Sequence, residues 1–176
     1  MNTGKYLSKY SSPLGMLTLS SDGENITGLW IEGQKYFAAS LSSDAVYREL
    51  PVFEEAFHWL DIYFAGENPD FMPKLATNGS AFQEAVWAIL RRVPYGQVTT
   101  YGKIANQLEN THTNNSFAQA VGGAIARNPI SILIPCHRVV GSNGSLTGYA
   151  GGIDRKIWLL QKEKIAMQNL FIPKNK

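Results

Sequence analysis

The chain has 176 residues, of which 44% are hydrophobic and one is a cysteine. This length fits one large domain or two small ones with a real apolar core, and no apolar run approaches the roughly 20 residues that cross a bilayer. The N-terminus lacks the hydrophobic core of a signal peptide, and a single cysteine excludes an internal disulfide. We therefore expect a cytoplasmic protein with no membrane partner.

The net charge of +2 conceals an asymmetry between the two parts of the chain. Residues 1–76 hold five Lys/Arg against ten Asp/Glu, a net charge of −5, whereas residues 77–176 hold eleven against four, a net charge of +7. A one-sided positive field is typical of a surface that binds a polyanion such as nucleic acid. A solvated surface without any partner would give the same counts.

The first third of the chain predicts strands followed by a helix. The stretch "MLTLSSDGENITGLWI", residues 16–31, alternates apolar and polar positions around an Asp-Gly turn, which is the pattern of a β-hairpin. The stretch "FEEAFHWLDIYFAGENP", residues 53–69, has apolar residues at helical spacing and ends in Gly and Pro. Nothing here points to catalysis, so residues 1–76 are predicted to form a small structural α/β domain with a short antiparallel sheet.

Residues 77–176 predict a mostly helical domain. Ser80 and Gln83 have capping-box spacing ahead of an apolar stripe that stops at "PYG". A second helix begins in "QVTTYGKIANQL", with Thr99 or Thr100 as its cap, and a third follows a polar loop in "FAQAVGGAIARNP". Two helices joined by a loop in a basic region suggest a helix-turn-helix, although any αα-hairpin gives the same pattern.

The third of these helices is nearly bare of side chains. Its small residues are Ala118, Ala120, Gly122, Gly123, Ala124 and Ala126. Two adjacent glycines lower helix stability by about 1 kcal/mol each relative to alanine, which suggests that something approaches the helix closely. That partner is either a narrow surface such as the minor groove of DNA or a tightly packed neighbouring helix.

The one cysteine, Cys136, ends the buried aliphatic run "ILIP". A free cysteine is most often a small core residue, but His137, Arg138 and the glycine-rich loop that follows favour a reactive thiol. Adjacent residues of an extended segment point to opposite sides, so we expect a water molecule to relay the proton between Cys136 and His137. Glu163, on the predicted last helix "DRKIWLLQKEKIA", is the carboxylate best placed in sequence to orient the imidazole.

Two other uses of the thiol are weaker. One Cys and three scattered His do not supply a cluster at zinc-ligand spacing, so no metal is expected. A cysteine hydrolase would use the same Cys and His but would also need an oxyanion hole, which nothing in the sequence marks.

The stretch "IPCHRVVGSNGSLTGYAGGIDRKIWLLQKE" closely resembles the active-site region of the O6-alkylguanine-DNA alkyltransferases, also called methylated-DNA-protein-cysteine methyltransferases. The likeness extends back through "FQEAVWAILRRVPYGQVTTYGKIA" and "AVGGAIARNPI", and so covers Ala81 to Glu163. Within it, "PCHRV" is a highly specific motif. The N-terminal third is compatible with the small, variable α/β domain of that family.

The resemblance implies an α+β fold in two domains, 1–76 and 77–176, with a winged helix-turn-helix in the second. It implies a monomer without metal or cofactor that binds duplex DNA through the minor groove, and it leaves cooperative binding open. The damaged O6-alkylguanine, and by extension O4-alkylthymine, would be flipped out of the duplex. The alkyl group would then pass irreversibly to Cys136, so that each molecule acts once.

The resemblance also implies roles for individual residues. Cys136 would be the acceptor, His137 the base acting through water, Glu163 its orienter, Asn128 the support of the turn before the thiol, and Tyr101 the residue that helps to rotate the nucleotide. The pocket would be lined by Tyr149, Val139, Ala150, Gly151, Ser131 and Lys156, of which Lys156 would assist the leaving guanine. DNA would be contacted by Gln119, Ala120, Gly122, Gly123, Ala126, Arg127, Arg138, Thr100 and Lys103, with Arg91 and Arg92 as further candidates for phosphate contacts.

One position departs from the family pattern. Where the family usually has an arginine just before "AVGG", this chain has Gln119, and the loop before it is longer than usual. Glutamine can fill the space of a flipped nucleotide but brings no charge. This departure leaves a second class open, an alkyltransferase-like protein that binds the lesion without accepting the alkyl group, although such proteins lack the cysteine.

Overall fold

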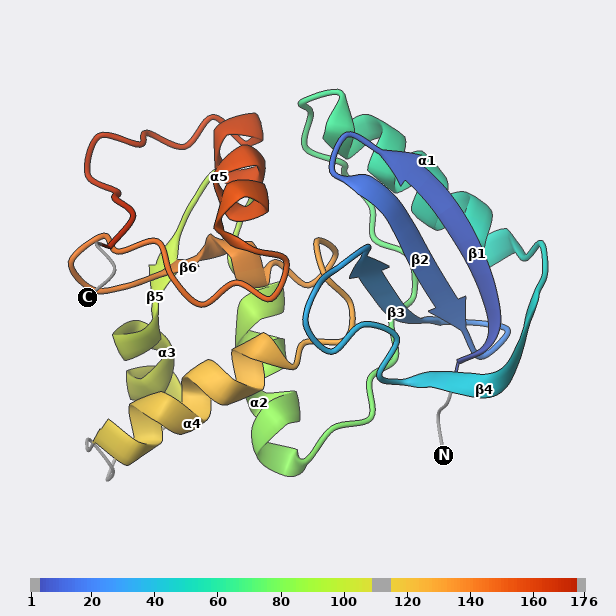
Figure 1. Ribbon diagram of the computed structural model, residues 1–176, viewed down its shortest axis with the longest axis horizontal. Helices are drawn as coiled ribbons and strands as arrows, with labels where there is room; N and C mark the ends of the chain where they lie inside the picture. Colours follow the sequence, from blue (N-terminus) through green and yellow to red (C-terminus); the bar gives the residue numbers. More distant parts are fainter. Residues whose placement is uncertain (1–3, 109–114, 174–176) are drawn as a thin grey trace. The chain divides into compact units, whose positions relative to one another are not determined.

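The computed structural model of the protein describes residues 4–108 and 115–173 (Figure 1). The chain forms two compact units. Unit 1 comprises Met1–Asn78 and Pro129–Leu133, and unit 2 comprises Gly79–Asn128 and Ile134–Lys176. In the described part of the chain, no helix is both long and apolar enough to cross a membrane.

Unit 1 is built on a four-stranded sheet with the order β3-β2-β1-β4. The strands are β1 (Gly4–Ser12), β2 (Gly15–Ser21), β3 (Ile26–Ile31) and β4 (Leu41–Tyr47). The pair β2 and β3 is antiparallel, with Leu17 opposite Ile31, which confirms the predicted hairpin. β1 and β4 were not predicted, and β4 runs parallel to β1, so the sheet is mixed at that edge.

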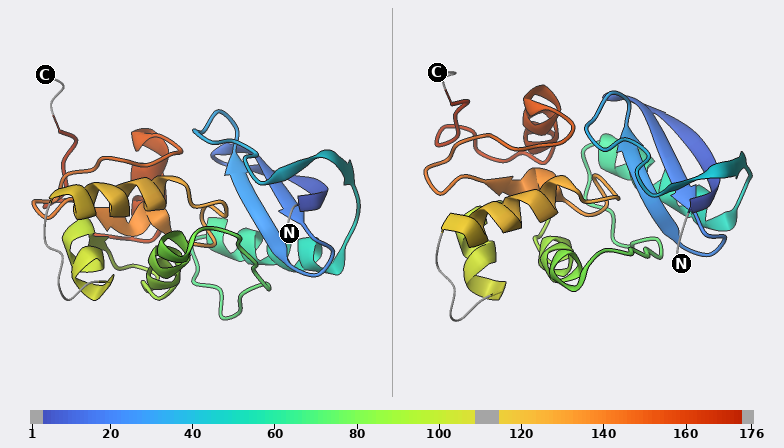
Figure 2. Two further views of the ribbon diagram at one scale, coloured as in Figure 1. Left: turned by 90° about the horizontal axis from the view of Figure 1, so that it is seen from below. Right: turned by 60° about the horizontal axis from the view of Figure 1, so that its bottom comes forward.

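Helix α1 (Pro51–Phe64) packs on this sheet (Figure 2). A proline in its first turn is favourable, because the N–H that proline lacks has no partner within the helix there. The helix buries Phe53, Ala56 and Leu60. This stripe recurs at helical spacing and forms the core of unit 1 with the buried residues of β2 and β3.

The segment 129–133 also belongs to unit 1, because it pairs with the edge of β3. The Leu29 N–H donates to the Pro129 carbonyl at 2.9 Å, and the Ser131 N–H donates to the Leu29 carbonyl at 3.0 Å. Ser131, which was predicted to line a substrate pocket, lies in this segment. Its side chain is buried in unit 1, with Oγ 3.3 Å from the Gln34 amide oxygen.

Unit 2 is mostly helical, as predicted. Its elements are α2 (Ala81–Arg91), β5 (Thr99–Thr100), α3 (Tyr101–Leu108), α4 (Asn115–Ala126), the 3-10 turn η1 (Cys136–Arg138), β6 (Val139–Val140) and α5 (Ile153–Lys162). The short strands β5 and β6 pair in parallel. Helices α2 and α3 both pack against α4, and the Trp87 indole N–H donates to the Ala124 carbonyl at 2.8 Å. The sheet of unit 1 and the helices of unit 2 together confirm the predicted α+β fold class.

Local sequence signals account for the starts of the helices. At α2, the Ser80 hydroxyl accepts from the Gln83 N–H at 3.1 Å, and the Gln83 side chain accepts from the Ser80 N–H at 3.0 Å, which is the predicted capping box. At α3, the Thr100 hydroxyl accepts from the Lys103 N–H at 3.1 Å. Thr100 is therefore the cap of the two that were considered.

Two local predictions around the thiol need correction. Cys136 was placed at the end of an extended segment, but Cys136–Arg138 form a single 3-10 turn, in which neighbouring side chains do not alternate across a strand. Glu163 was placed on the last helix, but α5 ends at Lys162 and Glu163 is its C-cap residue. From this cap position, the Glu163 carboxylate reaches His137 and Arg138 of the 3-10 turn.

Candidate active site

The turn Cys136–Arg138 buries three functional side chains at once, with exposed fractions of 5%, 0% and 7%. Two hydrogen bonds to Ile134 hold the chain just before it. The Cys136 N–H donates to the Ile134 carbonyl at 2.8 Å, and the side-chain amide of Asn128 donates to the same carbonyl, also at 2.8 Å. Asn128, just beyond the end of α4 at Ala126, therefore holds the segment before the turn.

The Glu163 carboxylate contacts His137, Arg138 and Gly96. One carboxylate oxygen lies 2.6 Å from His137 Nε2 and 3.1 Å from an Arg138 terminal nitrogen, and the other accepts from Arg138 Nε at 2.8 Å and from the Gly96 N–H at 3.0 Å. Burial by itself would raise the pKa of this carboxyl group, but the hydrogen bonds from His137 and Arg138 and the charge of Arg138 outweigh it and lower the pKa to about 2. Glu163 is therefore ionised at neutral pH.

His137 is neutral in this environment. Burial lowers the pKa of its imidazole, and the favourable charge of Glu163 does not reverse the direction, because Arg138 and Lys156 oppose a second positive charge nearby. An ionised carboxylate can only accept, so the Nε2 nitrogen that faces Glu163 carries the proton. The other ring nitrogen, Nδ1, then has the lone pair and is basic.

Arg138 was predicted to contact DNA, and the structure shows that it does not face the surface. Its guanidinium forms a bidentate pair with Glu163 and also donates to the Val93 carbonyl at 2.7 Å. Its charge lies 5.9 Å from the centre of the Tyr95 ring. A buried arginine in this arrangement neutralises Glu163, which is why the imidazole can stay uncharged.

Cys136 is a neutral thiol in the resting protein. Burial raises its pKa above the ordinary value, while the Asn128 hydrogen bond and the Lys156 charge act in the opposite direction. A buried thiol becomes a nucleophile when a base takes its proton. Within this site, the basic group is His137 Nδ1, and a water molecule between the two would complete the relay.

The loop after β6 lies beside the turn that carries the thiol. Tyr149 lies edge-on to the His137 ring at 6.5 Å, and its buried hydroxyl has no hydrogen-bond partner among the described residues. The Tyr101 hydroxyl donates to the Thr147 carbonyl at 3.0 Å. Burial raises the pKa of Tyr101 to about 12, so it stays a hydrogen-bond donor.

Lys156 is fully buried on α5 and holds β6 and this loop in place through hydrogen bonds to their backbone. Its ammonium donates to the Val139 carbonyl at 2.5 Å and to the Thr147 carbonyl at 2.9 Å. Burial lowers its pKa to about 8, and the nearby Cys136 opposes this shift. Ala150 and Gly151, the other predicted pocket residues, are half-buried in the same loop.

Helix α4 carries the predicted DNA-binding positions on an open face. Gln119, Ala120 and Gly123 are exposed, and Gly122 and Ala126 are half-buried. A Cβ added at Gly122 or Gly123 would meet nothing within 4 Å. The glycines therefore do not serve close packing on a neighbouring helix, which was one of the two explanations for the bare helix.

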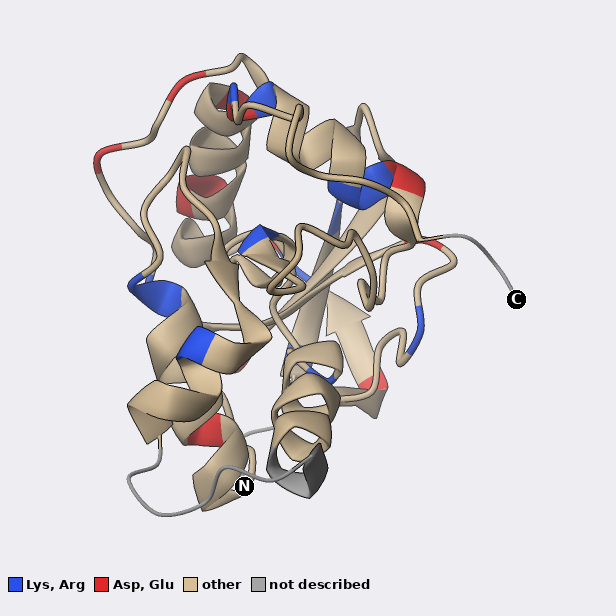
Figure 3. Ribbon diagram, turned by 90° about the vertical axis from the view of Figure 1, so that its left-hand side faces the viewer, with Lys and Arg blue, Asp and Glu red and all other residues tan. Residues whose placement is uncertain are grey.

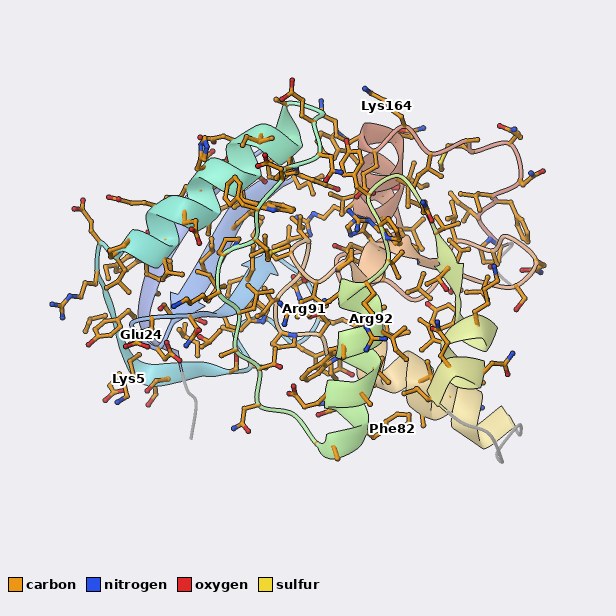
Figure 4. The ribbon with its side chains drawn as sticks, turned by 180° about the vertical axis from the view of Figure 1, so that it is seen from behind. Lys5, Glu24, Phe82, Arg91, Arg92 and Lys164 are labelled. Carbon is orange, nitrogen blue, oxygen red and sulfur yellow. The ribbon has the colours of Figure 1, made fainter. Side chains whose placement is uncertain are left out.

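The remaining predicted DNA-binding residues lie around this face. Lys103 and Arg127 are exposed and Thr100 is half-buried, while α4 itself has no charged residue (Figure 3). Arg91 and Arg92 are exposed at the C-terminal end of α2 (Figure 4). The stretch 106–119, which we predicted to be longer than usual, has its central residues 109–114 outside the described part of the chain. Among those described, no three His, Cys, Asp or Glu side chains are grouped as metal ligands would be.

Comparison with known proteins places this site in a family. Residues 5–77 match the model of the 6-O-methylguanine DNA methyltransferase ribonuclease-like domain, and residues 81–165 match that of its DNA binding domain. A methylated-DNA–protein-cysteine methyltransferase of Haemophilus influenzae is 43% identical over 93% of this chain and 88% of its own length. One of Methanosarcina acetivorans is 42% identical over 90% of this chain and 97% of its own length.

The chain belongs to the methylated-DNA–protein-cysteine methyltransferase family. Solved structures agree with this assignment. A crystal structure of Mycobacterium tuberculosis OGT in complex with DNA superposes with a TM-score of 0.78 at 40% identity, covering 90% of this chain and 92% of that one. The family resemblance inferred from "PCHRV" and the flanking motifs is thus confirmed.

Two features of this family member's site were missed by reasoning from sequence. Arg138 was assigned to the surface, and the Gly96 N–H was not considered as a partner of Glu163. A signal for Arg138 was present, because it is enclosed by buried aliphatic residues on both sides in "ILIPCHRVV". A charge in such a run needs a buried partner, and unit 2 offers few carboxylates.

Proposed function

We propose that this protein repairs O6-alkylguanine in duplex DNA by transferring the alkyl group to Cys136 Sγ in a single turnover. The observation that carries the proposal is the buried set of Cys136, His137, Arg138 and Glu163. It holds a neutral imidazole with its proton on the Glu163 side and its lone pair available for the thiol proton. The relatives named above support the same reaction by their names.

The chemical step balances without a cofactor. The Cys136 proton passes through water to His137 Nδ1, and the resulting thiolate attacks the alkyl carbon as the bond from that carbon to guanine O6 breaks. The electron pair of that bond stays on guanine O6. The base takes up a proton equivalent to the one that Cys136 gave up, and it remains in the DNA as unmodified guanine. A thioether remains on Sγ, so the thiol is not regenerated and each molecule reacts once.

The surroundings of the thiol favour breaking of the bond between the alkyl carbon and guanine O6. Charge grows on the base as the bond breaks, and hydrogen-bond donors fixed in a water-poor pocket stabilise that charge most effectively. The buried Tyr149 hydroxyl is such a donor, and the Tyr101 hydroxyl lies on the same wall. We assign Val139, Ala150 and Gly151 to the lining of the pocket, and Lys156 to holding its wall.

The open face of α4 supports a DNA contact. Guanine O6 lies inside the duplex, so the nucleotide must leave the base stack before Cys136 can reach it. A helix face of Ala and Gly with free space around it fits the narrow minor groove better than a helix with long side chains would. We propose that Gln119 enters the stack, with Arg127, Lys103 and Thr100 near the phosphates.

We also propose a division of labour between the domains and a place of action. Residues 77–176 would bind DNA and accept the alkyl group, and residues 1–76 would be structural. The protein would act as a monomer in the cytoplasm, with O4-alkylthymine as a second substrate.

The deciding experiment is the mass of the protein after it is mixed with duplex DNA that carries one O6-methylguanine. We expect a gain of one methyl group on the peptide that contains Cys136, saturating at one equivalent and absent in Cys136→Ala. An unchanged mass with preferential binding of the damaged duplex would instead make this protein a lesion-binding module. Continued turnover with a free thiol would indicate a hydrolase.

A further inference from the structure

Beyond α5, the chain turns back onto the loop that follows β6, which we assign to the wall of the alkyl-group pocket. We name residues 164–173 the C-terminal strap and residues 141–149 the pocket loop. The reversal occurs at Lys164, whose φ is +64° and which is labelled in Figure 4. The Leu146 N–H donates to the Phe171 carbonyl at 2.7 Å, and the Phe171 N–H donates to the Gly144 carbonyl at 3.1 Å.

Apolar side chains reinforce this pairing. Leu146 is 2% exposed and forms a cluster with the buried Val140 and Leu160. The strap supplies partly buried cover for this cluster from Ile165, Met167 and Leu170. Without the strap, one side of Leu146 would face water, and the pocket loop would lose its only long apolar anchor among residues 141–148.

The pocket loop is shaped to receive the strap. Gly144 has a φ of +91°, and a Cβ at that position would lie 2.0 Å from the Asn169 carbonyl oxygen. Any other residue would force the strap away. The close approach of the two backbones is therefore a specific fit, not a loose tail lying on the surface.

The other end of the pocket loop reaches the thiol. Directly after Leu146, the Thr147 carbonyl accepts from Tyr101 and from Lys156, and Tyr149 lies against the His137 ring. A shift of Leu146 is transmitted over one to three residues to these groups. The strap can thus change the position of Thr147 and Tyr149 without contacting the thiol itself.

The strap lies almost wholly beyond the part of the chain that the family model matches, which ends at residue 165. We propose that the C-terminal strap is a positioning element that sets how tightly the pocket loop closes around the alkyl group, and thereby which sizes of alkyl group are transferred quickly. This inference rests on the proposed function. Loops with few buried contacts open readily, and the strap supplies contacts that this loop otherwise lacks.

One residue of the strap allows a matched pair of variants. Phe171 contributes its backbone to the pairing, whereas its side chain is 44% exposed. Phe171→Pro removes the N–H that reaches Gly144, and Phe171→Ala keeps it. The single-turnover rate constants would be measured for duplexes that carry O6-methylguanine or O6-benzylguanine, together with amide hydrogen exchange at Leu146.

We expect Phe171→Pro to slow methyl transfer about tenfold, because small misplacements of reacting groups are costly. The ratio of benzyl to methyl transfer should rise by a similar factor, because a looser loop admits the larger group. Hydrogen exchange at Leu146 should become faster in the same variant. Phe171→Ala should match the wild type in all three measurements.

Two results would overturn the strap proposal while leaving the proposed function intact. One is a Phe171→Pro variant with the transfer rates of Phe171→Ala despite faster exchange at Leu146. The other is an equal loss of methyl and benzyl transfer with the ratio unchanged, which would indicate a structural role alone. If the wild type transfers neither group, the proposed function itself fails.

Discussion

Two regions of unit 2 differ in how their residues are held. The buried charge cluster, which consists of His137, Arg138, Lys156 and Glu163, is fixed by short hydrogen bonds from several elements. The outer face of α4, around Gln119 and Gly123, has open space where side chains would be. Residues of the first region are held by contacts within the folded protein, whereas Gly122 and Gly123 of the second region have free space beside them.

This difference separates the expected effects of mutation. A change in the buried charge cluster removes interactions of the folded protein, so it should reduce both stability and alkyl transfer. A change on the outer face of α4 removes nothing from the folded protein, so it should alter DNA binding with stability unchanged or improved. Measuring stability, alkyl transfer and DNA binding of variants in each region therefore tests the two proposed roles.

The largest effect is expected for Glu163→Gln. The amide cannot neutralise Arg138 or hold the Nε2 proton of His137 in the same way, and breaking a buried ion pair by removing one partner costs about 3–5 kcal/mol. Denaturant unfolding should show this loss, and the single-turnover rate constant should fall by about a hundredfold because the base loses its orientation.

A neighbouring carboxylate provides the control for that variant. Asp154 lies exposed in the first turn of α5. Asp154→Asn should change the free energy of unfolding by less than about 0.5 kcal/mol, as is usual for the surface. Equal effects of the two substitutions would show that the buried charge cluster is not what stabilises this unit.

Acid should weaken the protein through the same cluster. Glu163 has its pKa lowered from 4.5 to about 2. A lowered pKa means that the unfolded chain binds a proton first, so the stabilisation is complete above pH 4.5 and is lost as the pH falls toward 2. The full shift corresponds to about 3 kcal/mol. The lowered pKa of His137 acts in the same direction, beginning below its ordinary value of 6.5.

Unfolding free energies measured from pH 7 to pH 3 test this expectation. The wild type should lose stability progressively, and Glu163→Gln should show a flatter dependence below pH 4.5, because the group that titrates there is gone. Parallel curves for the two proteins would assign the acid sensitivity to other carboxylates.

Much of the fold was predictable because it depends on local patterns. The hairpin of β2 and β3, the stripe of α1 and the capping box at Ser80 all follow from the spacing of neighbouring residues. β4 was missed because its pairing with β1 is parallel and distant in sequence. Its exposed side chains also give no apolar run.

The site was predictable where a motif fixed it and not where a long-range contact did. "PCHRV" and the family resemblance identified Cys136, His137 and Glu163. The pairing of Arg138 with Glu163 could not be derived from charge alone, because a positive residue near DNA-binding elements is more often at the surface.

On the outer face of α4, Gly123→Ala should give opposite effects on stability and binding. The added methyl group meets nothing within 4 Å. Replacing a helical glycine by alanine should therefore stabilise the protein by up to about 1 kcal/mol. The same methyl group occupies space that we assign to the minor groove, so affinity for duplex DNA should fall. Higher stability with unchanged affinity would show that this face does not contact DNA.

The smallest effect on stability, and the sharpest test of the face, is expected for Gln119→Arg. The side chain is exposed, so the free energy of unfolding should stay within about 0.5 kcal/mol of the wild type. A positive charge placed at the DNA should tighten binding of a duplex that carries O6-methylguanine. It should also steepen the dependence of log affinity on log salt by about one.

The control for added charge is Gln107→Arg, which places the same substitution at an exposed position of α3. An arginine that stays outside the base stack raises affinity for any duplex through its charge, whereas one that enters the stack should favour the damaged duplex over the undamaged one. Gln119→Arg should therefore increase that preference, and Gln107→Arg should not. If Gln119→Arg binds the damaged duplex no better than the wild type, Gln119 does not occupy the position beside the flipped nucleotide, and the orientation of α4 on DNA must be assigned differently.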